Sequence, residues 1–149
     1  MKKYLSKIKK IKNKFGKFNH SEIDNVLNVL DNSNTDYVKK LESLFCRIFK
    51  VKYAIACNSG TSGLHSALAA LNLKKDDEVI VPGLTVVMDA YAALHLGATP
   101  IFADVDEETY LITADTIKKK LSKRTKAIIV VSLQGLPVDI DPIMKLEKS

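Results

Sequence analysis

The sequence predicts an α/β protein with a mainly parallel sheet flanked by helices and preceded by N-terminal helices. Two observations predict this class. From residue 53 onward, short apolar runs alternate with segments of helical periodicity, and such alternation indicates a parallel sheet with right-handed crossovers. The runs also lack polar–apolar alternation, which is typical of strands covered on both faces. No internal repeat interrupts this order.

Two amphipathic helices are expected before the sheet. Ser21 can cap the first of them, and the polar run 31–35 ends it. A second helix follows, with its apolar side chains on one side. In order, these two sets of apolar residues are Ile23, Val26, Leu27 and Leu30, then Val38, Leu41, Leu44, Phe45 and Ile48.

The alternating part of the chain contains four expected strands and four expected helices. The strands are Tyr53–Cys57, Glu78–Pro82, Thr99–Ala103 and Ala127–Val131. The helices are Thr61–Leu73, Thr85–Leu96, Ala114–Leu121 and Asp139–Lys148. The turns at 81–85 and 133–137 follow strands, so they lie at the carboxyl ends where ligands of open α/β sheets gather. With the turn after the first strand, they can line one site; each is also explained as an ordinary connection.

The turn within residues 53–63 is the most informative candidate site. Cys57 ends a strand, residues 58–60 turn the chain, and Thr61 and Ser62 open a helical pattern. A helix N-terminus offers unpaired N–H groups and partial positive charge, and glycine lets a ligand approach the backbone. This geometry suits a phosphate. An ordinary turn with a hydroxyl N-cap explains the same residues, so both interpretations stay open at this point.

Charge is distributed unevenly along the 149 residues. The formal net charge is +6, but residues 1–20 hold eight lysines and no acid, whereas the rest carries 15 basic and 17 acidic side chains. We therefore expect a lysine-rich N-terminal tail at 1–20 and one domain at 21–149. An amphipathic tail helix can touch a membrane surface or a nucleic acid, or pack against its own domain. No run is long enough for a membrane span, and no secretory signal is recognised.

The cysteines and histidines give no metal-ligand pattern. Cys46 and Cys57 are expected to be buried, reduced thiols of a cytoplasmic protein. His65 and His95 are interpreted as structural residues. The acidic stretch 104–108 lacks the glycine and distal glutamate of a calcium loop, so it is interpreted as a solvated turn. No metal site is predicted.

The order of several motifs resembles the DegT/DnrJ/EryC1/StrS family of sugar aminotransferases. The motifs are Lys52-Tyr53-Ala54-Ile55-Ala56, Asn58-Ser59-Gly60-Thr61, Asp77-Glu78-Val79-Ile80-Val81-Pro82, Leu96-Gly97-Ala98-Thr99-Pro100-Ile101-Phe102-Ala103-Asp104-Val105-Asp106, Arg124-Thr125-Lys126-Ala127-Ile128-Ile129 and Gly135-Leu136-Pro137-Val138-Asp139-Ile140-Asp141. The resemblance covers residues 20–149. It implies the incomplete large domain of a pyridoxal-phosphate-dependent transferase with the aspartate-aminotransferase type of fold. Most members move an amino group, usually from glutamate, onto a nucleotide-linked keto sugar.

The resemblance also assigns roles. Gly60, Thr61 and Ser62 match the turn that holds the phosphate of pyridoxal 5′-phosphate. Val86 matches the position where an aromatic ring commonly stacks on the pyridine; valine cannot stack in that way but can cover the face of the ring. Gln134 stands where the family often has an aromatic residue, and it is given no role.

The resemblance places two catalytic groups beyond residue 149. The aspartate near the pyridine nitrogen lies on the strand after the helix that begins near Asp139, and the Schiff-base lysine comes later. We therefore expect a truncated N-terminal part that is inactive alone and an intact enzyme that is a homodimer. In the family's sheet, the strands that separate Tyr53–Cys57 from the other three expected strands also come after residue 149. We expect those three strands to pair with one another, and we expect the chain alone to be marginally stable.

Three other functions can be distinguished from this one. A relative that uses the same cofactor for sugar dehydration would have a histidine in place of the later lysine. A non-catalytic protein would bind a partner or an anionic surface through the basic tail, which salt-dependent binding before and after deletion of residues 1–20 would reveal. A P-loop nucleotide binder is excluded, because residues 58–63 lack the glycine-lysine-serine/threonine ending.

Overall fold

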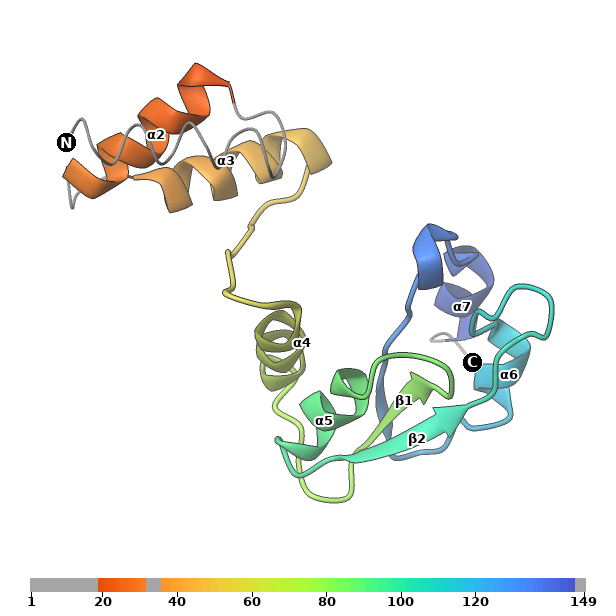
Figure 1. The fold of residues 1–149 in the computed structure, drawn as a ribbon. Coiled ribbons are helices and arrows are strands. Elements are labelled where there is room, and N and C mark those ends of the chain that lie inside the picture. Colours follow the sequence, from red (N-terminus) through yellow and green to blue (C-terminus); the bar gives the residue numbers. More distant parts are fainter. Residues whose placement is uncertain (1–18, 32–35, 147–149) are drawn as a thin grey trace. The chain divides into compact units, whose positions relative to one another are not determined.

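The computed structural model describes residues 19–31 and 36–146 (Figure 1). The chain divides into two compact units, residues 1–56 and 57–149. The prediction for the lysine-rich tail falls almost entirely outside the described residues. Each unit is described by itself below.

Two helices form the described part of the first unit, α2 (His20–Asp31) and α3 (Tyr37–Phe49). The N-cap of α2 is Asn19 rather than Ser21, since the Asn19 side chain accepts a hydrogen bond from the Glu22 N–H at 3.1 Å. The Tyr37 hydroxyl donates to the Asn25 side chain at 2.7 Å and ties the two helices together. The five predicted apolar residues of α3 are all exposed.

The predicted strand Tyr53–Cys57 is wrong for this structure, because these residues form no strand. A strand is stabilised by the ladder of a neighbour, and the described sheet contains only strands from the second unit. The Ala56 N–H donates instead to the Glu42 carboxylate at 2.9 Å, and the Ile55 side chain is 81% exposed. The prediction that Cys57 is buried is also wrong: Cys57 is exposed, and Cys46 is only half-buried.

The second unit contains a parallel three-stranded sheet in the order β2-β1-β3. Its strands are β1 (Glu78–Pro82), β2 (Thr99–Ala103) and β3 (Thr125–Ile128). Glu78 pairs with both Thr99 and Thr125, so the strands begin together at one end of the sheet. The expectation that these three strands pair with one another is confirmed.

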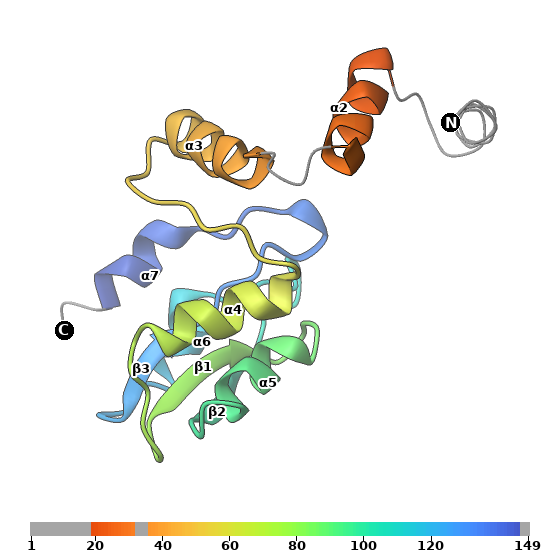
Figure 2. The ribbon, with the colours of Figure 1, turned by 90° about the vertical axis from the view of Figure 1, so that its left-hand side faces the viewer.

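Helices cover both faces of the sheet (Figures 1 and 2). They are α4 (Gly60–Ala69), α5 (Met88–Leu94), α6 (Ala114–Lys118) and α7 (Ile140–Leu146), with a short 3-10 helix, η1, at Leu133–Gly135. Val79 and Val81 of β1 pack with residues of α4 and α5, whereas Ile80 packs with residues of α6 and α7. Successive side chains of a strand point to opposite faces, so β1 contributes to two separate cores and is buried throughout.

The observed boundaries differ from the predicted ones mainly at the ends of elements. β1 and β2 have the predicted bounds. β3 begins two residues before the predicted strand, because its register is fixed by pairing with β1; Ile129 still donates its N–H to the Ile80 carbonyl at 2.8 Å. The four predicted helices all form. α4, α5 and α6 are shorter than predicted, α5 starts three residues later than expected, and the predicted end of α7 lies outside the described residues.

Candidate functional site

The carboxyl end of β1 leads into a loop that approaches β2 closely. Gly83 follows the strand and donates its N–H to the Ala103 carbonyl at 2.7 Å. A Cβ atom at Gly83 would lie 3.3 Å from the same oxygen, which is tighter than an ordinary van der Waals contact. Glycine therefore lets the loop pass close to the end of β2 and enter α5.

The N-terminus of α4 is organised by Ser59. Its side chain is the N-cap and accepts a hydrogen bond from the Ser62 N–H at 3.1 Å, while its carbonyl accepts one from the Gly63 N–H at 3.1 Å. The hydroxyls of Ser59 and Ser62 are also 3.0 Å apart and share a hydrogen bond. The local sequence thus builds a capped helix start from small polar residues, as preferred at this position.

Two N–H groups at this helix start are left for another partner. The first four N–H groups of an α-helix have no acceptor within the helix, and Ser59 satisfies those of Ser62 and Gly63. Within the described residues, no hydrogen bond uses the N–H groups of Gly60 and Thr61. Apart from its chain neighbours and its own helix backbone, no heavy atom of the described residues lies within 4 Å of a Cβ built on Gly60. The first turn of α4 therefore presents two donors, the partial positive charge of a ten-residue helix and open space.

Val86 lies in the loop between β1 and α5, and its side chain is 65% exposed. It precedes the first turn of α5 and is not covered by the sheet. An exposed aliphatic side chain here leaves an apolar surface on which a flat ring can rest. Val86 and the start of α4 both belong to the second unit, and only β1 and its flanking loops separate α4 from Val86 along the chain.

Asp89 is a buried carboxylate next to Val86 that the sequence reasoning missed. It is 3% exposed and accepts a hydrogen bond from the Thr85 hydroxyl at 2.6 Å. Asp89 also stands in the first turn of α5, where a negative charge is favoured by the helix dipole. The pair fixes the loop residues that carry Val86. In the sequence, the only sign of the Thr85–Asp89 pair is that the two residues are four positions apart.

Two histidines flank a small hollow beside the α4 start. The hollow has a volume of about 290 Å³ and is lined by Thr61, Ser62, His65, Ser66 and His95. The structure thus brings two of the predicted phosphate-binding residues together with both histidines of this unit. Gly60 and Val86 do not line the hollow.

An ion pair between the buried Glu78 carboxylate and the largely exposed Arg124 guanidinium lies at the opposite end of the sheet. Glu78, at the start of β1, is 4% exposed and accepts hydrogen bonds from the Ser122 hydroxyl and from the Arg124 guanidinium, whose Nε is 2.8 Å away. The hydrogen bonds from Ser122 and then Arg124 hold the pKa of Glu78 below 4.5. Because this pair joins β1 to the chain before β3 at the amino ends of the strands, its role is structural.

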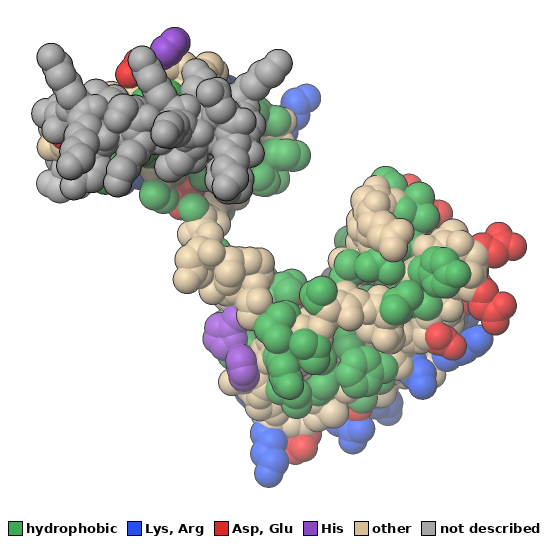
Figure 3. Space-filling view, viewed as in Figure 1, with side chains coloured by type: hydrophobic (Ala, Val, Ile, Leu, Met, Phe, Trp, Pro, Cys, Tyr) green, Lys and Arg blue, Asp and Glu red, His purple; other side chains and the backbone are tan. Residues whose placement is uncertain are grey.

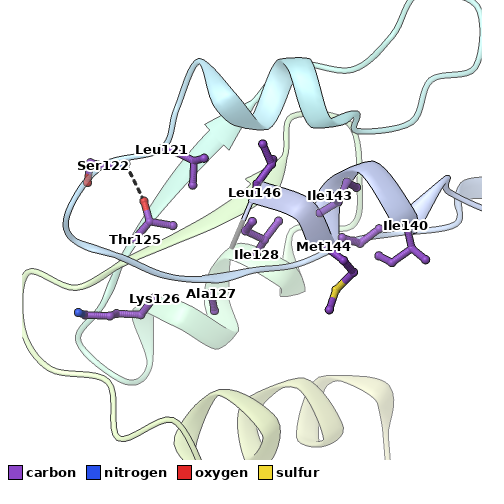
Figure 4. A pocket seen from close by; sticks show the side chains of 11 residues that line it. Leu121, Ser122, Thr125, Lys126, Ala127, Ile128, Ile140, Ile143, Met144 and Leu146 are labelled. Atoms are coloured by element: carbon purple, nitrogen blue, oxygen red, sulfur yellow. Dashed lines mark hydrogen bonds between the residues drawn. The ribbon is translucent and has the colours of Figure 1, made fainter. Parts of the chain in front are cut away.

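A larger cavity beside β3 has little chemistry to offer. It has a volume of about 430 Å³, and Figure 4 shows Ile128 of β3 and the α7 residues Ile143 and Met144 among its apolar lining. The lining contains one charged side chain, Lys126, which points away from α7 in Figure 4. With no acid–base pair on its wall, this cavity is not a candidate active site.

The described residues contain no cluster of three or more histidine, cysteine or acidic side chains that could hold a metal ion. In the acidic stretch 104–108, the Asp106 carboxylate accepts hydrogen bonds from the Glu108 and Thr109 N–H groups at 3.2 and 2.9 Å. The Thr109 hydroxyl adds a third at 2.8 Å. The hydrogen bonds from Thr109 lower the pKa of Asp106, and the stretch is a turn. Within residues 19–31 and 36–146, no helix is both long and apolar enough to cross a membrane.

Solved structures with the same arrangement define the class of protein. An aminotransferase from Psychrobacter cryohalolentis aligns with 88% of this chain and 34% of its own at a TM-score of 0.82 and 38% identity. An Escherichia coli GDP-4-keto-6-deoxy-D-mannose-3-dehydratase with bound hydrated PLP aligns with 89% of this chain and 36% of its own at a TM-score of 0.80 and 32% identity. The fold is that of pyridoxal-phosphate-dependent aminotransferases.

Sequence comparison identifies the family. Residues 15–149 match the DegT/DnrJ/EryC1/StrS aminotransferase family, and the chain belongs to it. Two GDP-perosamine synthases are similar to this chain. That of E. coli O157:H7 is 43% identical over 78% of this chain and 32% of its own length. That of Caulobacter vibrioides is 39% identical over 86% of this chain and 36% of its own length. The chain thus spans about a third of the length of these relatives. The family uses pyridoxal phosphate as its cofactor.

Proposed function

We propose that this chain supplies the phosphate-binding part of the cofactor site of an aminotransferase that acts on a nucleotide-linked keto sugar. The observation that carries the proposal is the pair of N–H groups at Gly60 and Thr61 that no described residue accepts from. The first turn of α4 offers donors, positive helix-end charge and room for a phosphate, so the residues present fit the group. The similarity to GDP-perosamine synthases favours a GDP-linked sugar as the substrate.

Each site residue has a specific part in this proposal. The Gly60 and Thr61 N–H groups and the Thr61 and Ser62 hydroxyls bind the phosphate, and Ser59 holds the turn in shape. Val86 covers one face of the pyridine ring, with Thr85 and Asp89 fixing its loop. When bound, pyridoxal phosphate supplies the carbonyl group that takes up and releases the amino group.

The proposed chemistry also needs a lysine and a carboxylate that act on the cofactor. In the family resemblance, the lysine and the aspartate that act on the cofactor correspond to positions after residue 149. We therefore propose that residues 1–149 alone do not catalyse amino transfer. In the complete enzyme, glutamate is the proposed amino donor, and a cytoplasmic homodimer is the proposed assembly.

A second candidate function is sugar dehydration with the same cofactor. It is favoured by the similarity to the GDP-4-keto-6-deoxy-D-mannose-3-dehydratase, whose fold matches the described residues as well as that of an aminotransferase does. The phosphate-binding turn would serve both reactions. The residue at the position of the Schiff-base lysine, a lysine or a histidine, distinguishes the two functions.

The proposal is tested in a chimera. Residues 15–149 replace the matching third of the Caulobacter vibrioides GDP-perosamine synthase, and cofactor content and amino transfer to the GDP-linked keto sugar are measured. We expect the chimera to hold the cofactor and Gly60→Asp to weaken it by tenfold or more, since a carboxylate about 5 Å from a phosphate dianion costs roughly 1.7 kcal/mol even at the dielectric constant of water. Gly63→Asp, three residues further along α4, is the matched control. Equal cofactor retention by Gly60→Asp and the unmodified chimera would overturn the assignment.

A further inference from the structure

His65 and His95 form a pair of imidazoles at one corner of the second unit. Figure 3 shows two histidine side chains, in purple, beside each other over α4 and α5. The centroids of the His65 and His95 rings are 6.2 Å apart, and the ring planes are inclined by 63°. The residues are 30 positions apart in the sequence, so the fold alone brings them together.

Two helices hold the pair in place. His65 lies on the second turn of α4, and His95 is the C-cap of α5, where its N–H donates to the Tyr91 carbonyl at 2.9 Å. The Tyr91 ring lies nearly parallel to the His95 ring, at an angle of 7° and a centroid distance of 6.2 Å. The α4 and α5 helices pack against the same core, which fixes the separation of the two rings.

The residues around the two histidines offer hydroxyl oxygens, which can act as ligands, and no permanently charged group. The remaining residues that line the hollow are Thr61, Ser62 and Ser66, all of which carry hydroxyls. Among the described residues, no carboxylate, ammonium or guanidinium group lines it. Nδ1 of His65 is buried and has no hydrogen-bond partner within the described residues. A buried polar atom without a partner calls for a bound water, ion or ligand.

We propose that His65 and His95 together bind a late first-row divalent cation such as Ni²⁺ or Zn²⁺. Neutral imidazole is a preferred ligand of these ions. Metal–nitrogen bonds of about 2.0–2.1 Å place two imidazole centroids roughly 5 Å apart at a tetrahedral angle. The observed separation of 6.2 Å is about 1 Å longer than this distance, and the exposed His95 side chain can turn about its side-chain torsions to shorten it. Hydroxyls of the hollow and water fill the remaining coordination positions.

The test of this site is independent of the proposed function, although Thr61 and Ser62 line the hollow and also belong to the proposed phosphate turn. It uses neither the cofactor nor any group after residue 149, and the cation would act as a link between α4 and α5. Because the metal ion binds the folded protein through two helices, it also stabilises that packing. The site is therefore detectable by affinity and by thermal unfolding, without any measurement of amino transfer.

The test uses tag-free protein in which both cysteines are replaced by serine, so that thiolates do not bind the ions. Binding of NiCl₂ and ZnCl₂ is measured by calorimetry, and the melting temperature is recorded with and without each ion. We expect one ion per chain and a higher melting temperature with the ion. His65→Asn and His95→Asn should each weaken binding at least tenfold, whereas His20→Asn, which changes the chain's third histidine on α2, should not.

Three results would overturn the proposal. One is a metal affinity of His95→Asn equal to that of the unmodified protein. Because His95 is exposed, this variant tolerates the substitution and remains informative if His65→Asn fails to fold. Another is a loss of affinity in His20→Asn as large as in the other two variants. The third is binding of inorganic phosphate, dependent on His65 and His95, by protein that binds neither metal ion; the hollow would then be an anion site.

Discussion

Replacing Ser59 by alanine removes the side chain that organises the start of α4. The variant loses the hydrogen bond from the Ser62 N–H at 3.1 Å and the one shared with the Ser62 hydroxyl at 3.0 Å. It keeps the bond from the Gly63 N–H to the Ser59 carbonyl, because that acceptor belongs to the backbone. Loss of a serine N-cap costs about 1 kcal/mol, since most of these groups are exposed and water replaces part of what is lost.

The expected effect is local and is measured by amide hydrogen exchange followed by NMR. A cost of about 1 kcal/mol corresponds to a roughly fivefold faster exchange of the Ser62 amide. Ser59→Thr keeps an oxygen at the same place and should exchange within about twofold of the unmodified chain. Thr113→Ala removes the equivalent cap of α6, where Thr113 accepts from the Thr116 N–H at 3.3 Å, and should leave Ser62 unaffected. An unchanged Ser62 rate in Ser59→Ala would refute the capping argument.

Two further predictions concern stability. Ile80→Ala, at a fully buried position of β1, should lower the free energy of unfolding by about 3 kcal/mol in urea titrations followed by circular dichroism, whereas Val86→Ala at an exposed position should change it by less than about 0.5 kcal/mol; similar values for both would contradict the core described above. Because hydrogen bonds from Ser122 and Arg124 lower the pKa of Glu78 below 4.5, its contribution to stability is present above the unfolded-state pKa and is lost as the pH falls through the folded-state pKa. A carboxyl NMR titration should show this lowered pKa and its return toward the ordinary value in Arg124→Ala; a pKa that stays the same in that variant would rule out the guanidinium as a cause.

The sheet was predictable where local sequence determines the element. β1 and β2 are apolar runs with clear ends, and the structure gives both the predicted bounds. The bounds of β3 depend on its register with β1, a tertiary property, and the predicted strand starts two residues and ends three residues after the observed one. Residues 53–57 have the composition of a strand but form none, because a strand needs a neighbour to supply hydrogen bonds.

The same distinction between local and tertiary effects applies to the candidate site. A hydroxyl N-cap is a local effect of a few residues, so the sequence predicted a capped helix start at Thr61; in the structure the helix starts one residue earlier, at Gly60, with Ser59 as the cap. The pairing of His65 with His95 depends on how α4 packs against α5, and the sequence reasoning treated the two histidines separately. Asp89 was missed because nothing in a single sequence shows that a carboxylate becomes buried.

The central claim is that the N–H groups at the start of α4 bind the phosphate of the cofactor. The most direct measurement is an NMR titration of the ¹⁵N-labelled chain with pyridoxal 5′-phosphate, with phosphate-free pyridoxal as the reference ligand. We expect the amides of residues 60–62 to shift with the phosphate ester and not with pyridoxal. Gly60→Asp should weaken or abolish these shifts, because its carboxylate repels the phosphate, and Gly63→Asp should preserve them. A Cβ at either position has no described non-local atom within 4 Å, so neither change creates a clash. Equal shifts with both ligands, or shifts that survive Gly60→Asp unchanged, would contradict the claim.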